Sequence, residues 1–150
     1  MLYSPVRGEV DTRSIAELAW AMGKVVLLPR TLRAERRIVP VVFEPGQTLV
    51  RGEYGIPEPP RGSEEVNVRH LQLVCLPGVA FGLDGSRLGY GGGYYDRLLR
   101  DPGFRAATCG LAFDLQVLCR LPRDPFDSTV DMVVTETRVI RPAPPSPVEY

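Results

Sequence analysis

The segment LQLVCLPGVAFGLDGSRLGYGGGYYDRLLR, residues 71–100, decides the fold of this chain. It opens with Leu71–Leu76, an apolar run with the length and composition of a buried strand, which Pro77-Gly78 ends. A loop with glycines at positions 89, 91, 92 and 93 follows, and the residues from Tyr94 to Arg100 predict a short helix. A strand, a glycine-rich loop and a helix in this order are typical of an α/β protein.

The flanking sequence extends this pattern in both directions. A helix is predicted from Asp11 to Met22, because Ile15, Leu18, Ala19 and Met22 recur at the spacing of one helical face. Gly23 supplies its stop. Residues 44–62 are rich in glycine and proline and predict a loop. Further strands are predicted at Val25–Leu28 (ended by Pro29), Ile38–Phe43 (an edge or bulged strand because of Pro40), Ala106–Phe113 and Met132–Thr135.

The alternation of helices and strands predicts an α/β fold with a mostly parallel sheet. Its length of 150 residues fits one domain, which we place at residues 1–141. Residues 142–150 contain several prolines and little apolar surface, so we expect a mobile tail there.

Composition excludes several classes of protein. Eighteen basic residues balance eighteen acidic ones, so the chain lacks the basic excess of a general nucleic-acid binder. No run approaches the ~20 apolar residues of a membrane span, and a signal peptide is not recognisable. The three cysteines, Cys75, Cys109 and Cys119, form no Cys-x-x-Cys pair, and we expect reduced packing residues. These features predict a cytoplasmic protein whose partners are neither nucleic acids nor membranes.

The glycine loop carries the chemistry that the sequence suggests. Glycines reach positive φ without penalty and let a ligand approach the backbone, so successive N–H groups can converge on an anion. Arg87 could clamp phosphate oxygens, and Asp96 could hold a Mg²⁺ ion that bridges to phosphates. The helix that begins near Tyr94 would add amide donors and the positive end of its dipole. A tight turn without any ligand explains the glycine spacing equally well, and the loop matches neither the Walker pattern nor the dinucleotide fingerprint.

The complete string is more specific. Leu76-Pro77-Gly78-Val79-Ala80-Phe81 followed by Arg87-Leu88-Gly89-Tyr90-Gly91-Gly92-Gly93-Tyr94-Tyr95-Asp96-Arg97 closely resembles the signature of the 5-formyltetrahydrofolate cyclo-ligases, also called methenyltetrahydrofolate synthetases. Three other segments resemble the same family in the same order: Gly8-Glu9-Val10-Asp11-Thr12, Tyr54-Gly55-Ile56-Pro57-Glu58-Pro59, and Gly110–Asp114 continuing to Pro125–Asp131 and Thr135-Glu136.

The resemblance implies a Rossmann-like, three-layer α/β sandwich. It also implies ATP-dependent cyclisation of 5-formyltetrahydrofolate to 5,10-methenyltetrahydrofolate, with Mg²⁺ required and ADP and phosphate released. Phosphorylation of the formyl oxygen would make it a leaving group, and such a transfer needs mainly positioning and electrostatic stabilisation.

The site residues follow from the same resemblance. Arg87 would be catalytic, and the ATP phosphates would be held by Arg87, Leu88, Gly89, Tyr90, Gly91, Gly92, Gly93, Tyr94 and Tyr95. Glu9, Tyr94 and Tyr54 would contact the folate, although simple packing explains Tyr54 as well. Asp96 and Asp127 would bind the metal, with Asp131 close enough in sequence to compete with Asp127. Arg33, Arg36 and Arg37 read as a solvated surface instead.

One feature departs from the family pattern. Members usually carry a basic helical segment ahead of Gly8-Glu9-Val10, and here the chain begins near the end of the first expected strand. An alternative is therefore a non-catalytic folate- or nucleotide-binding protein of the same family. An exposed strand edge would favour a dimer, so we expect a monomer or a homodimer.

Overall fold

In this computed structural model, residues 1–122, 124 and 127–143 are described. The helices are α1 (Arg13–Ala21) and α2 (Tyr94–Leu99), with 3₁₀ turns at Glu53–Gly55, Val68–His70 and Asp114–Gln116. The strands are β1 (Leu27–Leu32), β2 (Arg37–Val42), β3 (Val50–Arg51), β4 (Pro57–Glu58), β5 (Leu73–Leu76), β6 (Ala80–Gly82), β7 (Arg87–Leu88), β8 (Ala107–Leu111), β9 (Val117–Leu118), β10 (Met132–Val134) and β11 (Val139–Ile140).

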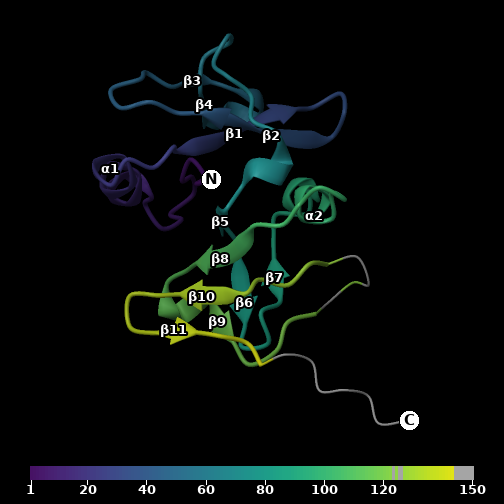
Figure 1. Cartoon of the computed structure of the whole chain (residues 1–150). Helices are drawn as coiled ribbons and strands as arrows, with labels where there is room; N and C mark the ends of the chain where they lie inside the picture. Colours follow the sequence, from purple (N-terminus) through teal and green to yellow (C-terminus); the bar gives the residue numbers. More distant parts are fainter. Residues whose placement is uncertain (123, 125–126, 144–150) are drawn as a thin grey trace.

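The strands pair in both senses (Figure 1). The largest sheet has the order β11-β10-β8-β5, in which β5, β8 and β10 are parallel and β11 is antiparallel. The hairpins β1–β2, β3–β4 and β6–β7 are antiparallel, whereas β6 and β9 are parallel. The α/β class is confirmed, but the expected mostly parallel sheet is not, because short hairpin connections join several consecutive strands.

The first residues of the chain connect two of these sheets. The amide of Leu2 donates to the carbonyl of Leu27 in β1 (2.8 Å), and the amide of Cys75 in β5 donates to the carbonyl of Met1 (2.9 Å). Residues 1–2 therefore lie between β1 and β5 and extend the hydrogen-bonded surface across both.

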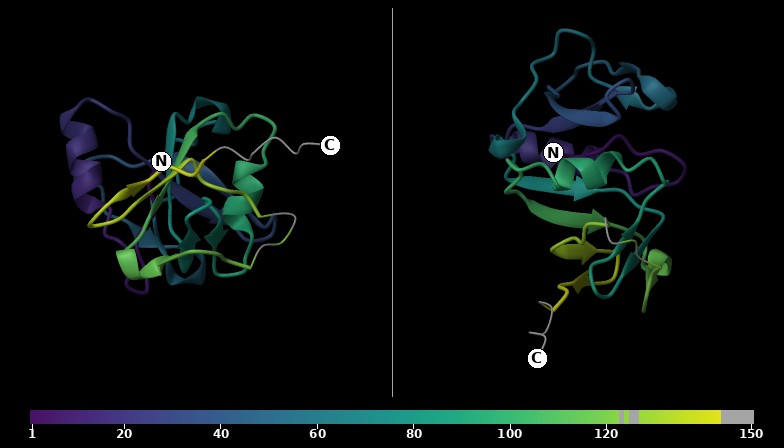
Figure 2. Two further views of the ribbon diagram at one scale, coloured as in Figure 1. Left: turned by 90° about the horizontal axis from the view of Figure 1, so that it is seen from below. Right: turned by 90° about the vertical axis from the view of Figure 1, so that its right-hand side faces the viewer.

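The central strands are covered on both faces. Side chains alternate along a strand, so Val74 and Leu76 of β5 enter one apolar cluster, with Phe81 and Val133, while Cys75 enters a second with Tyr3 and Ala16. Residues of α1 pack in the second cluster and residues of α2 against the first. Accordingly, the helices flank the strands on opposite sides (Figure 2). A complete three-layer, Rossmann-like sandwich stays a prediction, because one helix on each side leaves the layers incomplete within the described residues.

Helix α1 lies where the sequence predicts it, but it is rotated. Gly23 ends it with φ +68°, donating to Trp20, and the amide of Lys24 donates to Ala19, the Schellman arrangement. Leu18 and Met22, predicted as core, are 62% and 64% exposed. Ile15 and Ala19 of the predicted face do pack in the core, and Ala16 and Trp20 join them. The Trp20 indole packs on the Phe43 ring and donates to the Phe43 carbonyl (3.2 Å).

Pro29 does not end β1 as expected. It lies directly opposite Pro40 of β2, and the carbonyl of Pro40 accepts from the amide of Val66 on the outer side (2.9 Å). The carbonyl of Pro40 therefore points away from β1, and the pairing of the two strands at this position needs no N–H from either proline. On the outer side of β2, the described residues form an isolated bridge between Val41 and Glu65 and no further strand, so the prediction of an edge strand is confirmed.

The glycine loop follows the hairpin β6–β7, which the sequence analysis did not predict. The sequence placed the loop after the strand ending at Leu76, but it emerges from β7, an antiparallel partner of β6. The strands of this hairpin contain glycine and arginine and show no continuous apolar run, so it was missed. Cys75 and Cys109 are buried as expected, whereas Cys119 is exposed.

The structure does not test the predicted tail or the predicted single domain. Most of the predicted tail, residues 144–150, lies outside the described residues, and the single domain at 1–141 stays a prediction. Among the helices that the structure describes, none is long and apolar enough to cross a membrane.

The contact between Gly110 and Phe81 provides a test of the core. A Cβ at Gly110 would lie 2.4 Å from Cε1 of Phe81, which is fully buried. We expect Gly110→Ala to lower the free energy of unfolding by about 1–3 kcal/mol through overpacking, measured by urea denaturation. In a Phe81→Leu background, Gly110→Ala should lower the free energy of unfolding by less than it does in the wild type, since the two positions are in contact. Strictly additive effects of the two substitutions would contradict the contact.

Candidate active site

The glycine loop, residues 89–93, presents its backbone to solvent. Tyr90, Gly91 and Gly92 are exposed, and Gly91 and Gly93 have φ values of +86° and +68°, where an L side chain is strained. Within the described part of the chain, the amides of residues 90–93 donate to no other protein group. Successive unbonded amides in a glycine loop form a potential anion site. Helix α2 spans only six residues, so its dipole adds little to this site.

Arg87 lies beneath the loop. Its side chain is 4% exposed, and it bonds the carbonyl of Pro77 (3.2 Å) and both carboxylate oxygens of Asp96 (3.3 Å each). The guanidinium also lies 5.6 Å from the centre of the Tyr95 ring. Its Nε is buried without a hydrogen-bond partner. A Cβ at Gly89 would approach Nη1 of Arg87 to 2.9 Å, so a larger residue at this position would require the guanidinium to shift.

This burial limits what Arg87 does in the arrangement described. Its two terminal nitrogens are already engaged, one by the Pro77 carbonyl and the other by the Asp96 carboxylate. Direct contact with Arg87 therefore requires Asp96 or the loop to move. Burial also raises the pKa of the Tyr95 phenol well above its ordinary range, so Tyr95 stays neutral around Arg87.

Asp96 is the carboxylate closest to the loop in sequence, and it is half-buried. Among the described residues, its Oδ1 accepts, besides the Arg87 contact, a long bond from the amide of Ser128 (3.4 Å). This bond brings the segment beginning at Asp127 to the site. The Asp127 carboxylate accepts from the amide of Asp124 (2.8 Å) and so shapes its own turn.

Asp131 has a different position. One of its oxygens accepts from both the amide (2.7 Å) and the hydroxyl (2.9 Å) of Thr108, and the Asp131 amide donates back to that hydroxyl. This closed arrangement ties Asp131 to β8. No group of three or more His, Cys, Asp or Glu side chains suited to a metal is found among the described residues.

Glu9 reaches the glycine loop through Tyr90. Its carboxylate accepts from the amide of Val6 (2.9 Å), and the Tyr90 phenol lies close enough to affect its pKa, while Arg7 lies over the Tyr90 ring at 5.1 Å. Burial raises the pKa of Glu9 above its ordinary value, although the Val6 amide, Tyr90 and Arg7 act in the opposite direction.

Tyr54 reaches the loop from the other side. It is 59% exposed with φ +58°, and its hydroxyl lies 2.8 Å from that of Tyr94, with the rings edge to face. Arg33 lies over the Tyr54 ring at 5.5 Å. Arg33 is exposed, as the sequence predicts, and its guanidinium also lies against this ring. Sequence spacing gave no signal for that contact, because 21 positions separate the two residues.

The structure therefore gathers most of the predicted residues around one loop: Arg87, Gly89 to Asp96, Glu9 beside Tyr90, and Tyr54 through Tyr94. Asp127 is connected to them only through the backbone of its neighbour Ser128. Sequence reasoning missed Arg97. Its Nη1 donates to the carbonyls of Gly92 (3.0 Å) and Arg36 (2.9 Å).

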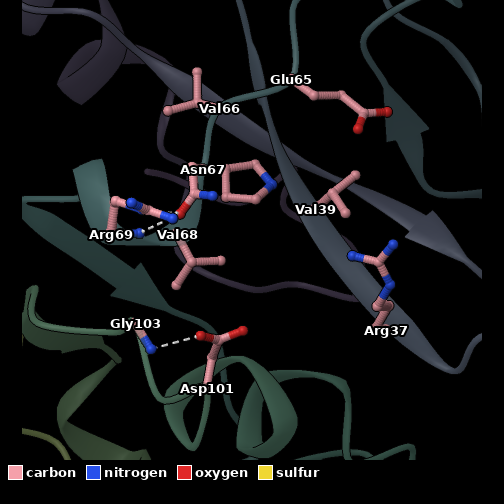
Figure 3. A pocket seen from close by; sticks show the side chains of 10 residues that line it. Arg37, Val39, Glu65, Val66, Asn67, Val68, Arg69, Asp101 and Gly103 are labelled. Carbon is pink, nitrogen blue, oxygen red and sulfur yellow. Dashed lines mark hydrogen bonds between the residues drawn. The ribbon is translucent and has the colours of Figure 1, made fainter.

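A cavity of about 570 Å³ lies elsewhere, between β2, residues 65–69 and the turn after α2 (Figure 3). Arg37, Arg69, Glu65 and Asp101 line it. Arg37 pairs with Glu35, Arg69 bonds Asn67, and Asp101 accepts from the amide of Gly103. The charged side chains that line this cavity are of both signs and already have partners. The cavity therefore favours neither an anionic nor a cationic ligand. The loop with unbonded amides is the better candidate site.

A glycine loop with free amides beside a carboxylate, on an α/β scaffold, defines a class of phosphate-binding proteins. Comparison with known proteins is more specific. The model of the 5-formyltetrahydrofolate cyclo-ligase family matches residues 1–136. The chain therefore belongs to this family.

Similar proteins carry the same description. The 5-formyltetrahydrofolate cyclo-ligase of Escherichia coli K12 is 33% identical over 135 residues, covering 88% of this chain and 74% of the relative. The probable cyclo-ligase of Schizosaccharomyces pombe is 32% identical, covering 89% and 72%. The NMR structure of Aquifex aeolicus 5,10-methenyltetrahydrofolate synthetase matches with a TM-score of 0.80 at 38% identity, over 99% of this chain and 74% of that one. These relatives are named as enzymes.

Glu9 offers a test by pH. A folded pKa above the unfolded value means that the protonated carboxyl contributes stability at low pH, which is lost as the pH rises through the folded pKa. Glu9→Gln keeps an acceptor for Val6 but carries no charge. We expect its melting temperature to match the wild type below the ordinary pKa of Glu and to exceed it at neutral pH, as followed by calorimetry across pH 3–8. A variant less stable than the wild type at neutral pH would contradict the assignment.

Proposed function

We propose that this protein cyclises 5-formyltetrahydrofolate to 5,10-methenyltetrahydrofolate, with ATP consumed and ADP and phosphate released. The unbonded amides of residues 90–93, next to Asp96 in a member of this family, carry the proposal. The names of similar proteins indicate the same activity.

The reaction needs an activated oxygen. In the proposed scheme, the terminal phosphoryl group of ATP passes to the formyl oxygen of the substrate. The second folate nitrogen then attacks the formyl carbon and loses its proton, and phosphate leaves with the oxygen. Phosphoryl transfer of this kind depends on positioning and on stabilising negative charge. Backbone amides fixed in advance supply that stabilisation without reorganising during the reaction.

Each residue has a proposed place in this scheme. The amides of residues 90–93 bind the phosphates, and Arg87 positions Asp96 from below. Glu9 and the Tyr54–Tyr94 pair border the folate, with Glu9 bonding the pterin. Tyr95 stacks beside Arg87 and limits water access to it.

The donor set around Asp96 fits Mg²⁺ in type. Magnesium prefers oxygen ligands and commonly uses one or two carboxylates together with substrate phosphates, so three protein carboxylates are not needed. Asp96 would hold the ion, and Asp127 is favoured over Asp131, whose carboxylate is committed to Thr108. The bound ion would neutralise phosphate charge.

We further infer a cytoplasmic protein acting as a monomer or homodimer on this small substrate. No observation favours the alternative of a non-catalytic binding protein, and the assay below separates the two.

The test is direct. The protein is incubated with Mg-ATP and 5-formyltetrahydrofolate, and the near-ultraviolet absorbance of the methenyl product is followed. We expect turnover, and we expect Asp96→Asn to lower it about 10²-fold or more. Asp101→Asn, on the exposed turn after α2, is the matched control and should retain wild-type turnover.

Stability is measured alongside, because removing the partner of a buried guanidinium destabilises the fold. The comparison is made at a temperature where both variants are folded. Folate binding with no product at high wild-type concentration would reject the enzyme. Full activity in Asp96→Asn would remove the role given to that carboxylate.

A further inference from the structure

The contact between Arg97 and the glycine loop has no role in the scheme above. Arg97 lies on α2, half-buried, and its Nη1 bonds two backbone carbonyls, that of Gly92 at 3.0 Å and that of Arg36 at 2.9 Å. The guanidinium also lies 6.0 Å from the centre of the Tyr94 ring. One side chain thus joins the loop to the turn between β1 and β2, 61 positions earlier.

This contact sets the direction of a particular amide. The peptide unit between Gly92 and Gly93 is planar and trans, so its C=O and N–H point in opposite directions. Arg97 holds the Gly92 oxygen, and the Gly93 N–H must therefore face away from Arg97. That amide is one of those without a protein acceptor.

The loop backbone at residues 91–93 has no side chains of its own that could fix it. Glycines lose more conformational freedom on ordering than other residues, and Gly93, the N-cap of α2, provides no side-chain cap. The Arg36 carbonyl lies in the turn that leads into β2, where the Arg36 amide donates to the carbonyl of Arg33 (3.1 Å). Arg97 therefore connects the glycine loop to a hydrogen-bonded turn.

We infer that Arg97 is a positioning residue for the phosphate-binding loop. It orients the Gly93 amide toward the ligand by holding the Gly92 carbonyl against the β1–β2 turn. The inference rests on the proposed function for its effect on ATP, but the orientation of the amide does not depend on turnover.

Kinetics of Arg97→Ala provide the first test. With the loop less ordered, the KM for ATP should rise about tenfold while the KM for 5-formyltetrahydrofolate changes less than twofold. Arg97→Lys retains a donor that reaches one carbonyl, so its KM for ATP should lie between that of the wild type and that of Arg97→Ala. Arg105→Ala is the matched control, because Arg105 also bonds backbone carbonyls, those of Pro102 and Phe104, away from the loop. It should leave both KM values unchanged.

An NMR measurement on the protein without nucleotide provides the second test. The amide signal of Gly93 should shift in Arg97→Ala and keep its position in Arg105→Ala. An unmoved Gly93 signal overturns the inference, whatever the activity. An unchanged KM for ATP, or equal changes in both KM values with a lowered melting temperature, also overturns it, since the residue would then support the fold only. Absence of any turnover in the wild type would instead count against the proposed function, and the Gly93 signal would still decide the role of Arg97.

Discussion

The buried guanidinium of Arg87 is the constraint on which the site depends. A charge removed from water must be paired and hydrogen-bonded, and Arg87 meets this need with Asp96, the Pro77 carbonyl and the Tyr95 ring. Those contacts join β7, the end of β5 and α2 at one point. The glycine loop passes over that point, and Gly89 is small enough to let it do so. Its amides remain exposed because the layer beneath is already filled by partnered side chains.

Two groups of side chains extend the site away from this centre. Glu9 and Arg7 contact Tyr90 on one side, whereas Tyr54 and Arg33 contact Tyr94 on the other. Each group comes from a loop with residues at positive φ, including Arg7 and Tyr54. Non-glycine residues in this region are strained, and such strain often accompanies functional sites. The proposed folate contacts therefore lie on loops, while the proposed phosphate contacts lie on the backbone between β7 and α2.

Much of the fold could be predicted because the long elements have clear periods. The helix at α1, the strands β5, β8 and β10 and the helix α2 lie close to their predicted positions. The hairpin β6–β7 was missed, since its strands of three and two residues contain glycine and arginine and show no continuous apolar run. The buried face of α1 was assigned wrongly at Leu18 and Met22, because Trp20 found a ring to pack on in Phe43, a partner that the helix sequence cannot reveal.

The sequence by itself determined the family, the glycine loop and the identity of the residues around it, because these depend on a contiguous string of residue types. Only the tertiary structure decided which groups face the loop. It buried Arg87, engaged Asp131 with Thr108, brought Arg33 onto Tyr54 and connected Arg97 to the carbonyl of Arg36. These contacts join residues far apart in the chain, and their geometry follows from how the sheets, hairpins and helices pack together, which local spacing does not encode.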